Sequence, residues 1–182
     1  MSTTIVAGAK GGQGTTTVAA SLAIIAARCN RPVVLIDTGG DAASILDHPP
    51  TTPADDLAAG LDQARSIDGV QLVHLPADRT DANTVRIVSE LATNGAAIVV
   101  DAGVDPSVVR QFDAVRPRPQ RVLVVRPCYL AVRRAAAVPY TPDHIVLVRE
   151  RLRSLTTDDV ERALALPVTT VDHDPVIARA ID

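Results

Sequence analysis

The side chains best suited to chemistry lie in one glycine-rich loop near the start of the chain. The loop reads Gly8-Ala9-Lys10-Gly11-Gly12-Gln13-Gly14-Thr15-Thr16-Thr17 and contains the single lysine of the sequence, against seventeen arginines. The apolar run Thr4–Ala7 before it predicts a strand, and Thr16–Cys29 after it predicts a helix. A glycine loop between a strand and a helix N-terminus presents backbone N–H groups and the positive end of a helix dipole, which together bind phosphate.

This loop resembles the deviant phosphate-binding loop of the ParA/MinD family of ATPases, whose usual form is Lys-Gly-Gly-x-Gly-Lys-Thr-Thr. The resemblance implies that Lys10 is the family's signature lysine, which reaches across a dimer to the partner's nucleotide and is a candidate catalytic residue. It also implies that Thr16 ligates magnesium. The implied phosphate contacts are Gly11, Gly12, Gln13, Gly14, Thr15, Thr16 and Thr17.

The loop departs from the family pattern at two positions. Thr15 stands where the family has its second lysine, which contacts the β- and γ-phosphates within the same subunit. Ala9 replaces the opening glycine of the ordinary motif. The main cation of the phosphate site is therefore missing, and a glycine-rich turn that binds no ligand is the alternative interpretation.

An acidic residue, Asp37, directly follows the second predicted strand, Pro32–Ile36. In nucleotide-binding α/β sheets the ligand lies outside the carboxyl ends of the strands, which places Asp37 beside the loop. The family has Asp-x-Asp here, so the resemblance implies that Asp37 belongs to the magnesium shell and is a weak catalytic candidate. The second acid, which helps to position the attacking water, is replaced by Gly39. Asp41 is a candidate substitute only if the loop is reshaped, and Asp37 is alternatively a turn residue.

A second acid, Asp101, follows the apolar run Ala96–Val100. It matches the position at which the family orients Mg²⁺ with a carboxylate through water. The expected magnesium ligands are therefore Thr16, Asp37 and Asp101, partly through water. The family usually continues with proline, whereas this chain has Ala102, and a turn or helix-cap role is the alternative interpretation of Asp101.

The base-binding part of the family pattern is matched least. Arg149 follows the predicted strand Ile145–Val148, near the position where the family often has an asparagine that contacts adenine. Asp174 keeps the acid of the family's Ile-Pro-x-Asp segment after the predicted strand Val168–Val171. Arg149 and Asp174 are therefore the candidate base-binding residues, and adenine itself is an expectation of the family alone.

The rest of the chain alternates strands with helices. Further strands are predicted at Val70–Leu75 and Arg121–Val125, and further helices at Ala82–Thr93, Pro106–Val115, Leu130–Val138 and Thr157–Leu164. Residues 48–57 predict an exposed loop that leads into a short helix. This order predicts one α/β domain over residues 1–182, with a doubly wound, mostly parallel, seven-stranded sheet and helices on both faces, like a P-loop NTPase.

Composition narrows the class of protein. Hydrophobic residues make up 47% of the 182 residues and aromatic residues only 2%, which predicts an aliphatic core around a buried parallel sheet. The net charge of −3 gives no strong attraction to nucleic acid. Cys29 and Cys128 are too few for a disulfide framework or a metal cluster, and no leader or membrane-spanning run is evident. We therefore expect a cytoplasmic protein without a membrane anchor.

Hydrolysis of ATP on such a fold depends on positioning and on charge stabilisation of the transferred phosphoryl group. Because Thr15 and Gly39 both replace charged residues, we expect weak or absent hydrolysis on a fold that binds ATP or ADP with Mg²⁺. The resemblance implies a homodimer that acts as a switch or scaffold and positions a partner complex. Partitioning, cell division and polar secretion or pilus machinery are the expected settings.

Two alternatives stay open. The first is a DNA-associated partition protein that binds nucleic acid through Arg116, Arg118 and Arg121, or through Arg149, Arg151 and Arg153. A solvated arginine-rich surface is favoured over that interpretation, given the net negative charge. The second is an active ATPase with an unusual loop, whose turnover would disappear when Lys10 is changed to alanine.

Overall fold

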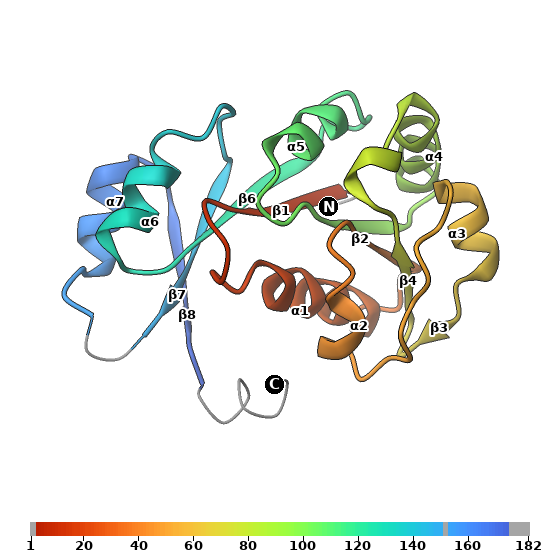
Figure 1. The fold of residues 1–182 in the computed structure, drawn as a ribbon, viewed down its shortest axis with the longest axis horizontal. Coiled ribbons are helices and arrows are strands. Elements are labelled where there is room, and N and C mark those ends of the chain that lie inside the picture. Colours follow the sequence, from red (N-terminus) through yellow and green to blue (C-terminus); the bar gives the residue numbers. More distant parts are fainter. Residues whose placement is uncertain (1–2, 151–152, 175–182) are drawn as a thin grey trace.

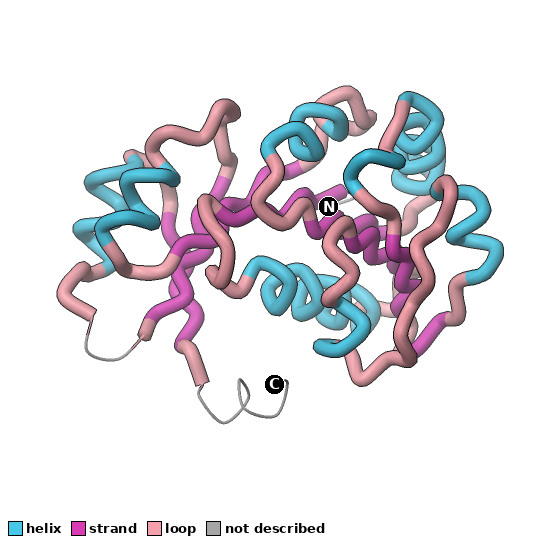
Figure 2. The backbone as a smooth tube through the Cα atoms, in the orientation of Figure 1, coloured by secondary structure: helices cyan, strands magenta, loops and turns pink. Residues whose placement is uncertain are grey.

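The computed structural model describes residues 3–150 and 153–174, whose strands form one sheet through the middle of the molecule (Figures 1 and 2). Most of these strands are built from valine, isoleucine and leucine and are buried on both faces, as strands of a parallel sheet between helices should be. The strands are β1 (Thr3–Gly8), β2 (Val33–Asp37), β3 (Ser66–Ile67), β4 (Val70–His74), β5 (Ala97–Asp101), β6 (Gln120–Val125), β7 (His144–Arg149) and β8 (Val168–Asp172).

The strand order is β3-β4-β2-β5-β1-β6-β7-β8, and every neighbouring pair except β3 with β4 is parallel. This confirms the doubly wound α/β fold, but the described sheet has eight strands rather than the seven expected. The additional strand, β3, is two residues long and joins β4 through a tight turn at Asp68 and Gly69, both with positive φ. A two-residue strand carries too little alternation to be found from sequence.

Helices cover both faces of the sheet. They are α1 (Thr15–Arg28), α2 (Ala42–Ile45), α3 (Leu57–Gln63), α4 (Ala82–Thr93), α5 (Pro106–Phe112), α6 (Tyr129–Ala135) and α7 (Thr157–Leu164), with a short 3₁₀ helix at Ala77–Arg79. Alanines of α1 and α2 pack on one face, below the central strands in Figure 1, while α4 and α5 lie above them. Side chains of α3, α4 and α5 share one hydrophobic cluster and those of α6 and α7 share another.

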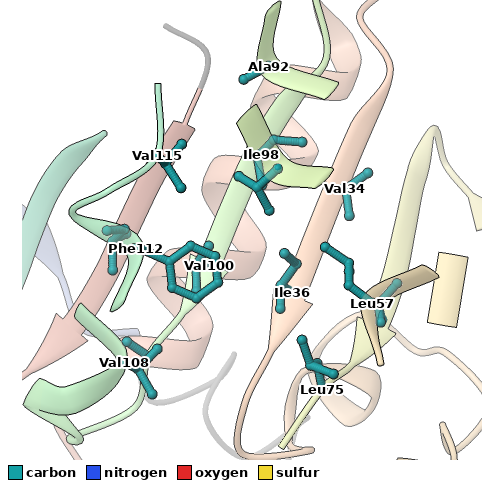
Figure 3. Packing of buried hydrophobic residues seen from close by; sticks show 14 of the residues in the cluster. Val34, Ile36, Leu57, Leu75, Ala92, Ile98, Val100, Val108, Phe112 and Val115 are labelled. Carbon is teal, nitrogen blue, oxygen red and sulfur yellow. The ribbon is translucent and has the colours of Figure 1, made fainter. Parts of the chain in front are cut away.

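The core is aliphatic, as the composition predicts. Phe112 of α5 is fully buried and lies among Val100, Val108 and Val115 in the close view of the packing (Figure 3). Helices α5 and α6 each end three residues earlier than expected. After α6, Val138 precedes Pro139, and the residue before a proline is disfavoured in helical conformation.

The topology brings the carboxyl ends of four strands together. β2, β5, β1 and β6 are consecutive neighbours in the sheet, and Asp37 is the register partner of Asp101 across the β2–β5 pair. Both acids are the last residues of their strands rather than the first loop residues. The loop after β1 is therefore flanked by the ends of the strands that carry the candidate site residues.

Candidate functional site

The glycine-rich loop turns the chain from β1 into α1 with two glycines in left-handed conformation. Gly12 has φ of 70° and Gly14, the residue that precedes the first turn of α1, has φ of 86°. Among the described residues, no side chain caps α1 and no acidic residue lies in its first turn. The N–H groups of this first turn are therefore left for a ligand, and an anion is what the helix dipole favours there.

Thr15, at the position of the missing lysine, is buried against the end of β1. A Cβ atom added to Gly8 would lie 2.5 Å from Thr15 Oγ1, so only glycine fits at residue 8 beside this hydroxyl. Thr15 is 8% exposed. The side chain thus packs into the base of the loop and brings no positive charge to the phosphate site.

Gln13 ties the loop to the strand next to β1. Its side chain is 2% exposed, and its Oε1 accepts a hydrogen bond of 2.8 Å from the backbone N–H of Arg126, directly after β6. A buried amide with a partner far along the chain fixes the loop relative to the sheet. The family motif predicts only a phosphate contact for Gln13, and this second role has no signal in the sequence.

Asp37 holds the loop after β2 in place. Its Oδ1 accepts hydrogen bonds from the N–H groups of Gly39, at 2.9 Å, and Gly40, at 3.0 Å, and its Oδ2 accepts one of 2.7 Å from Ala42. The carboxylate is fully buried. With three backbone donors bound, Asp37 has little remaining capacity for direct metal ligation, and contact through a water molecule is the arrangement that fits.

Asp101 is the second buried carboxylate at this edge of the sheet. It is 1% exposed, and its Oδ1 accepts a hydrogen bond of 3.0 Å from Gly103. Burial raises the pKa of Asp101 above its ordinary value of 3.8, and the nearby charges of Asp37 and Asp41 raise it further. Hydrogen bonds from the side chain of Thr16 and the backbone of Gly103 lower the pKa in part. The hydroxyl of Thr16 thus lies near the carboxylate of Asp101, as a shared magnesium site requires.

The structure brings Asp41 toward the position of the missing second acid. A Cβ atom added to Gly39 would lie 3.8 Å from Asp41 Oδ2 and 3.7 Å from Asp37 Oδ1, which are ordinary contact distances. Asp41 is exposed and precedes the first turn of α2. The loop therefore has room for a side chain at residue 39, and the Asp41 carboxylate lies beside that room; its role as the substitute acid stays a prediction.

The glycine-rich loop and Asp41 lie on the wall of one pocket of about 580 Å³, whereas the buried Asp37 and Asp101 are not among its wall residues. It is lined by Lys10, Gly11, Gly12, Gln13, Gly14, Thr15, Thr16, Thr17, Asp41, Ser44, Ile45, Gly103, Val104 and Arg126. All of the predicted phosphate-contacting residues thus lie on its wall. Arg126 is a wall residue that was not predicted, although the rule that indicates Asp37 and Asp101, the end of a central strand, applies equally to the end of β6.

The donors around this pocket fit a nucleotide with Mg²⁺. The hydroxyl of Thr16 and the carboxylates of Asp101 and Asp37 are hard oxygen ligands, which Mg²⁺ prefers. Within the described part of the chain, no three His, Cys, Asp or Glu side chains come close enough together to hold a metal ion. Phosphate oxygens and water would therefore complete the shell of a magnesium ion bound here, as is usual for this metal in nucleotide sites.

Comparison with known protein families agrees with the geometry of this pocket. The family model described as the CobQ/CobB/MinD/ParA nucleotide binding domain matches residues 4–169. The chain belongs to this family. Comparison with proteins of curated function finds no match.

Solved structures of the family have the same fold. MinD in a MinC:MinD cell division complex of Aquifex aeolicus matches with a TM-score of 0.78 and 20% identity, over 100% of this chain and 85% of the other. MinD of Pyrococcus horikoshii OT3, solved with Mg-ADP, matches with a TM-score of 0.73 and 20% identity, over 98% and 85%. A variant of McdA from Cyanothece, solved as its ATP complex, matches with a TM-score of 0.68 and 15% identity, over 100% and 86%.

The candidate base-binding residues lie away from the phosphate pocket wall. Arg149 is the register partner of Asp172 across β7 and β8, and its Nε donates a 2.7 Å hydrogen bond to Asp172 Oδ1. This bond, together with the charge of Asp172, raises the pKa of Arg149. Asp174 is exposed at the end of the described chain. The family role of both residues at a base stays a prediction.

The arginine clusters considered for DNA binding are largely engaged with acids or main-chain oxygens. Arg118 and Arg121 both contact Asp143, at 2.9 Å and 3.4 Å. Arg116 donates to two backbone carbonyls. In the second cluster Arg149 and Arg153 are ion-paired, and Arg151 lies outside the described residues. None of the helices in residues 3–150 and 153–174 is long and apolar enough to span a membrane.

Proposed function

We propose that the protein is a nucleotide-dependent switch or scaffold of the MinD/ParA type, which binds ATP or ADP with Mg²⁺ and hydrolyses ATP slowly or not at all. The observation that carries this proposal is the pocket at the uncapped N-terminus of α1, which has Thr16 on its wall and the buried Asp101 close enough to Thr16 for that hydroxyl to lower its pKa. Together they offer one magnesium ligand, one carboxylate to orient it and a row of N–H groups for phosphate.

Slow hydrolysis follows from two missing charges. Charge stabilisation of the transferred phosphoryl group is usually the largest catalytic contribution in such sites, and removal of one donor typically costs about 10²–10³ in rate. Thr15 replaces one cation with a buried neutral hydroxyl, and Gly39 removes one carboxylate near the attacking water. Binding is affected less than turnover because backbone N–H groups contribute to it.

The position of Asp41 favours slow ATP hydrolysis over none at all. Its carboxylate lies near the space that a side chain at residue 39 would occupy, and it lines the phosphate pocket. A general base or water-positioning group must lie within hydrogen-bond reach of the water, directly or through one more water. In this second candidate function, an active ATPase, any turnover disappears in Asp41→Asn.

A homodimer and a protein partner complete the proposal. MinD of Aquifex aeolicus was solved in complex with MinC, which supports a partner protein as the reader of the switch. Lys10 is half-buried on the pocket wall and is the group proposed to reach the nucleotide of a second subunit. DNA is not favoured as the partner, because the described arginines of both clusters are paired or bonded to main-chain oxygens.

The test is ATP turnover by the wild type and by Thr15→Lys/Gly39→Asp, which restores both family charges. Ordinary contact distances around residue 39 leave room for the new aspartate. We expect turnover by the double variant to exceed that of the wild type by about tenfold or more, since each restored charge is worth at least that much. Wild-type turnover equal to that of the double variant would contradict the proposed slow hydrolysis.

Two controls separate the possible reasons for low turnover. Thr15→Ser keeps a small hydroxyl beside Gly8 and adds no charge. This variant should therefore hydrolyse ATP at the wild-type rate. Thr15→Lys/Gly39→Asp/Asp101→Asn removes the magnesium-orienting carboxylate and should lose the restored activity. A double variant that gains turnover independently of Asp101 would show that the reaction does not take place at this site.

A further inference from the structure

We infer that Arg126 supplies the positive charge on the nucleotide phosphates that the loop has lost at Thr15. This inference deepens the proposed function and rests on it. It assigns to the end of β6 a binding role that the ParA/MinD motif places in the loop itself. The residues of the pocket wall, the partners of the guanidinium and the charges near it support this assignment.

Among the described residues, Arg126 is one of two cations on the wall of the phosphate pocket, the other being Lys10. Its main chain is fixed relative to the loop, because its N–H donates to the buried side chain of Gln13 at 2.8 Å. The base of the arginine side chain is therefore held beside the loop, directly after β6, the strand that neighbours β1. Such preorganisation reduces the entropy lost when the side chain binds an anion.

The guanidinium has hydrogen-bonding capacity left for an anion. Its Nη1 donates to Glu150 Oε1 at 2.7 Å, while its Nε is buried and has no partner among the described residues. A guanidinium carries five N–H donors in a planar fork and binds phosphate through two of them at once. A buried donor without a partner is unfavourable. The Arg126 side chain as a whole is 30% exposed, so other N–H groups of its guanidinium can bind a phosphate oxygen in the pocket.

Glu150 positions this arginine through a shared carboxylate. Its side chain is 15% exposed; Oε1 binds Arg126 and Oε2 binds Arg153. Two arginines around one acid leave a net positive charge at this corner of the pocket. Arg153 is bound to the same carboxylate but does not line the pocket, so it is a matched control for the charge of Arg126.

The experiment measures the affinity of the full-length protein for ATP, ADP, AMP and adenosine by calorimetry with Mg²⁺, for the wild type, Arg126→Gln and Arg153→Gln. Arg126→Gln should weaken ATP binding about tenfold or more, since a hydrogen bond to a charged group is lost. The loss of affinity caused by Arg126→Gln should be smaller for ADP and AMP, which carry fewer phosphates, and absent for adenosine. Arg153→Gln should change the affinity for ATP by no more than about twofold, as expected for the loss of an exposed ion pair.

A double-mutant cycle tests whether Arg126 replaces the lysine. The loss caused by Arg126→Gln should be smaller in the Thr15→Lys background than in the wild type, because both cations would serve the same phosphates. Arg126→Lys should recover part of the ATP affinity, and thermal unfolding of each variant without nucleotide checks that it folds.

Three outcomes among proteins that bind nucleotide, and in which Arg126→Gln has an effect, would overturn the inference. They are equal loss for ATP and adenosine, equal effects of Arg126→Gln and Arg153→Gln, and additive effects of Arg126→Gln and Thr15→Lys. Wild-type binding that Arg126→Gln leaves unchanged overturns this inference while the proposed function stands. A wild type that binds none of the nucleotides overturns both.

Discussion

Asp101 is a carboxylate that the fold keeps away from water, beside two other acids, at a cost in stability. Its burial and the neighbouring charges of Asp37 and Asp41 raise its pKa, which means that the folded state disfavours its charged form. Thr16 and Gly103 compensate only in part. A bound magnesium ion would remove this penalty, so the residue links metal binding to stability.

Asp101→Asn should therefore stabilise the nucleotide-free protein at neutral pH. Because the pKa of Asp101 is raised in the folded state, this carboxyl binds more protons in the folded protein than in the unfolded chain just above pH 3.8, and its own contribution to stability falls as pH rises through that window. The melting temperature of the variant should exceed that of the wild type at pH 7 by a few degrees, since about 1 kcal/mol corresponds to roughly 2–4 °C in a domain of this size.

Thermal unfolding from pH 4 to pH 8 measures this difference. The melting temperature of Asp101→Asn should exceed that of the wild type only slightly at the acidic end. The difference should grow as the pH rises and then level off. An advantage that grows on acidification would mean that Asp101 is stabilised in its charged form. The comparison is informative because the asparagine oxygen can still accept the N–H of Gly103.

Single residues of the site can be predicted from the sequence where a side chain able to bind a metal ion stands at the end of a strand. Asp37 and Asp101 stand out because an acid follows a short apolar run. The partner of Gln13 is not predictable, since its hydrogen bond to Arg126 joins residues 113 positions apart. Arg126 also follows an apolar run, but it is one of seventeen arginines, so this position at the end of a strand is its only signal in the sequence.

At the scale of elements, α3 shows how packing overrides helix propensity. Gly60 lies inside this helix and is buried against β4. A Cβ atom added there would lie 2.4 Å from Val73 Cγ1 and 3.0 Å from the Cβ of Ala54. Glycine lets the helix approach the sheet closely.

Gly60→Ala should destabilise the protein, although alanine is favoured over glycine by about 1 kcal/mol in an open helix. Overpacking of this kind typically costs about 1–3 kcal/mol. Urea unfolding measures the change in the free energy of unfolding. In a Val73→Ala background the same substitution should cost less, and a Gly60→Ala protein more stable than the wild type would contradict the packing seen here.

Long elements are predictable and short ones are not. Continuous apolar runs locate the seven longer strands. Helices α4 and α7 span the residues expected for them and begin with reciprocal capping hydrogen bonds. The two-residue β3, the four-residue α2 and the 3₁₀ helix Ala77–Arg79 have too few residues for a periodic pattern. Of these, α2 matters for the site, because it carries Ser44 and Ile45 on the pocket wall.

At the scale of the whole molecule, strand order decides which distant residues meet. β1 lies between β5 and β6, and β2 lies beyond β5, so the loop after β1 faces the ends of strands that come much later in the chain. The fold class follows from the alternation of strands and helices. The strand order does not follow from that alternation alone, and it is the strand order that places Arg126 opposite the loop.

The proposed function requires this site to bind a magnesium nucleotide despite Thr15. Calorimetry of ATP binding by the wild type and by Thr16→Val, with Mg²⁺ and with EDTA, tests it most directly. Valine keeps the shape of threonine and removes the hydroxyl that lowers the pKa of Asp101 and is the expected magnesium ligand. We expect wild-type binding that weakens about tenfold or more in EDTA or in Thr16→Val, as loss of a charge-assisted contact implies. A wild type that binds neither ATP nor ADP, while Thr15→Lys binds both, would contradict the account.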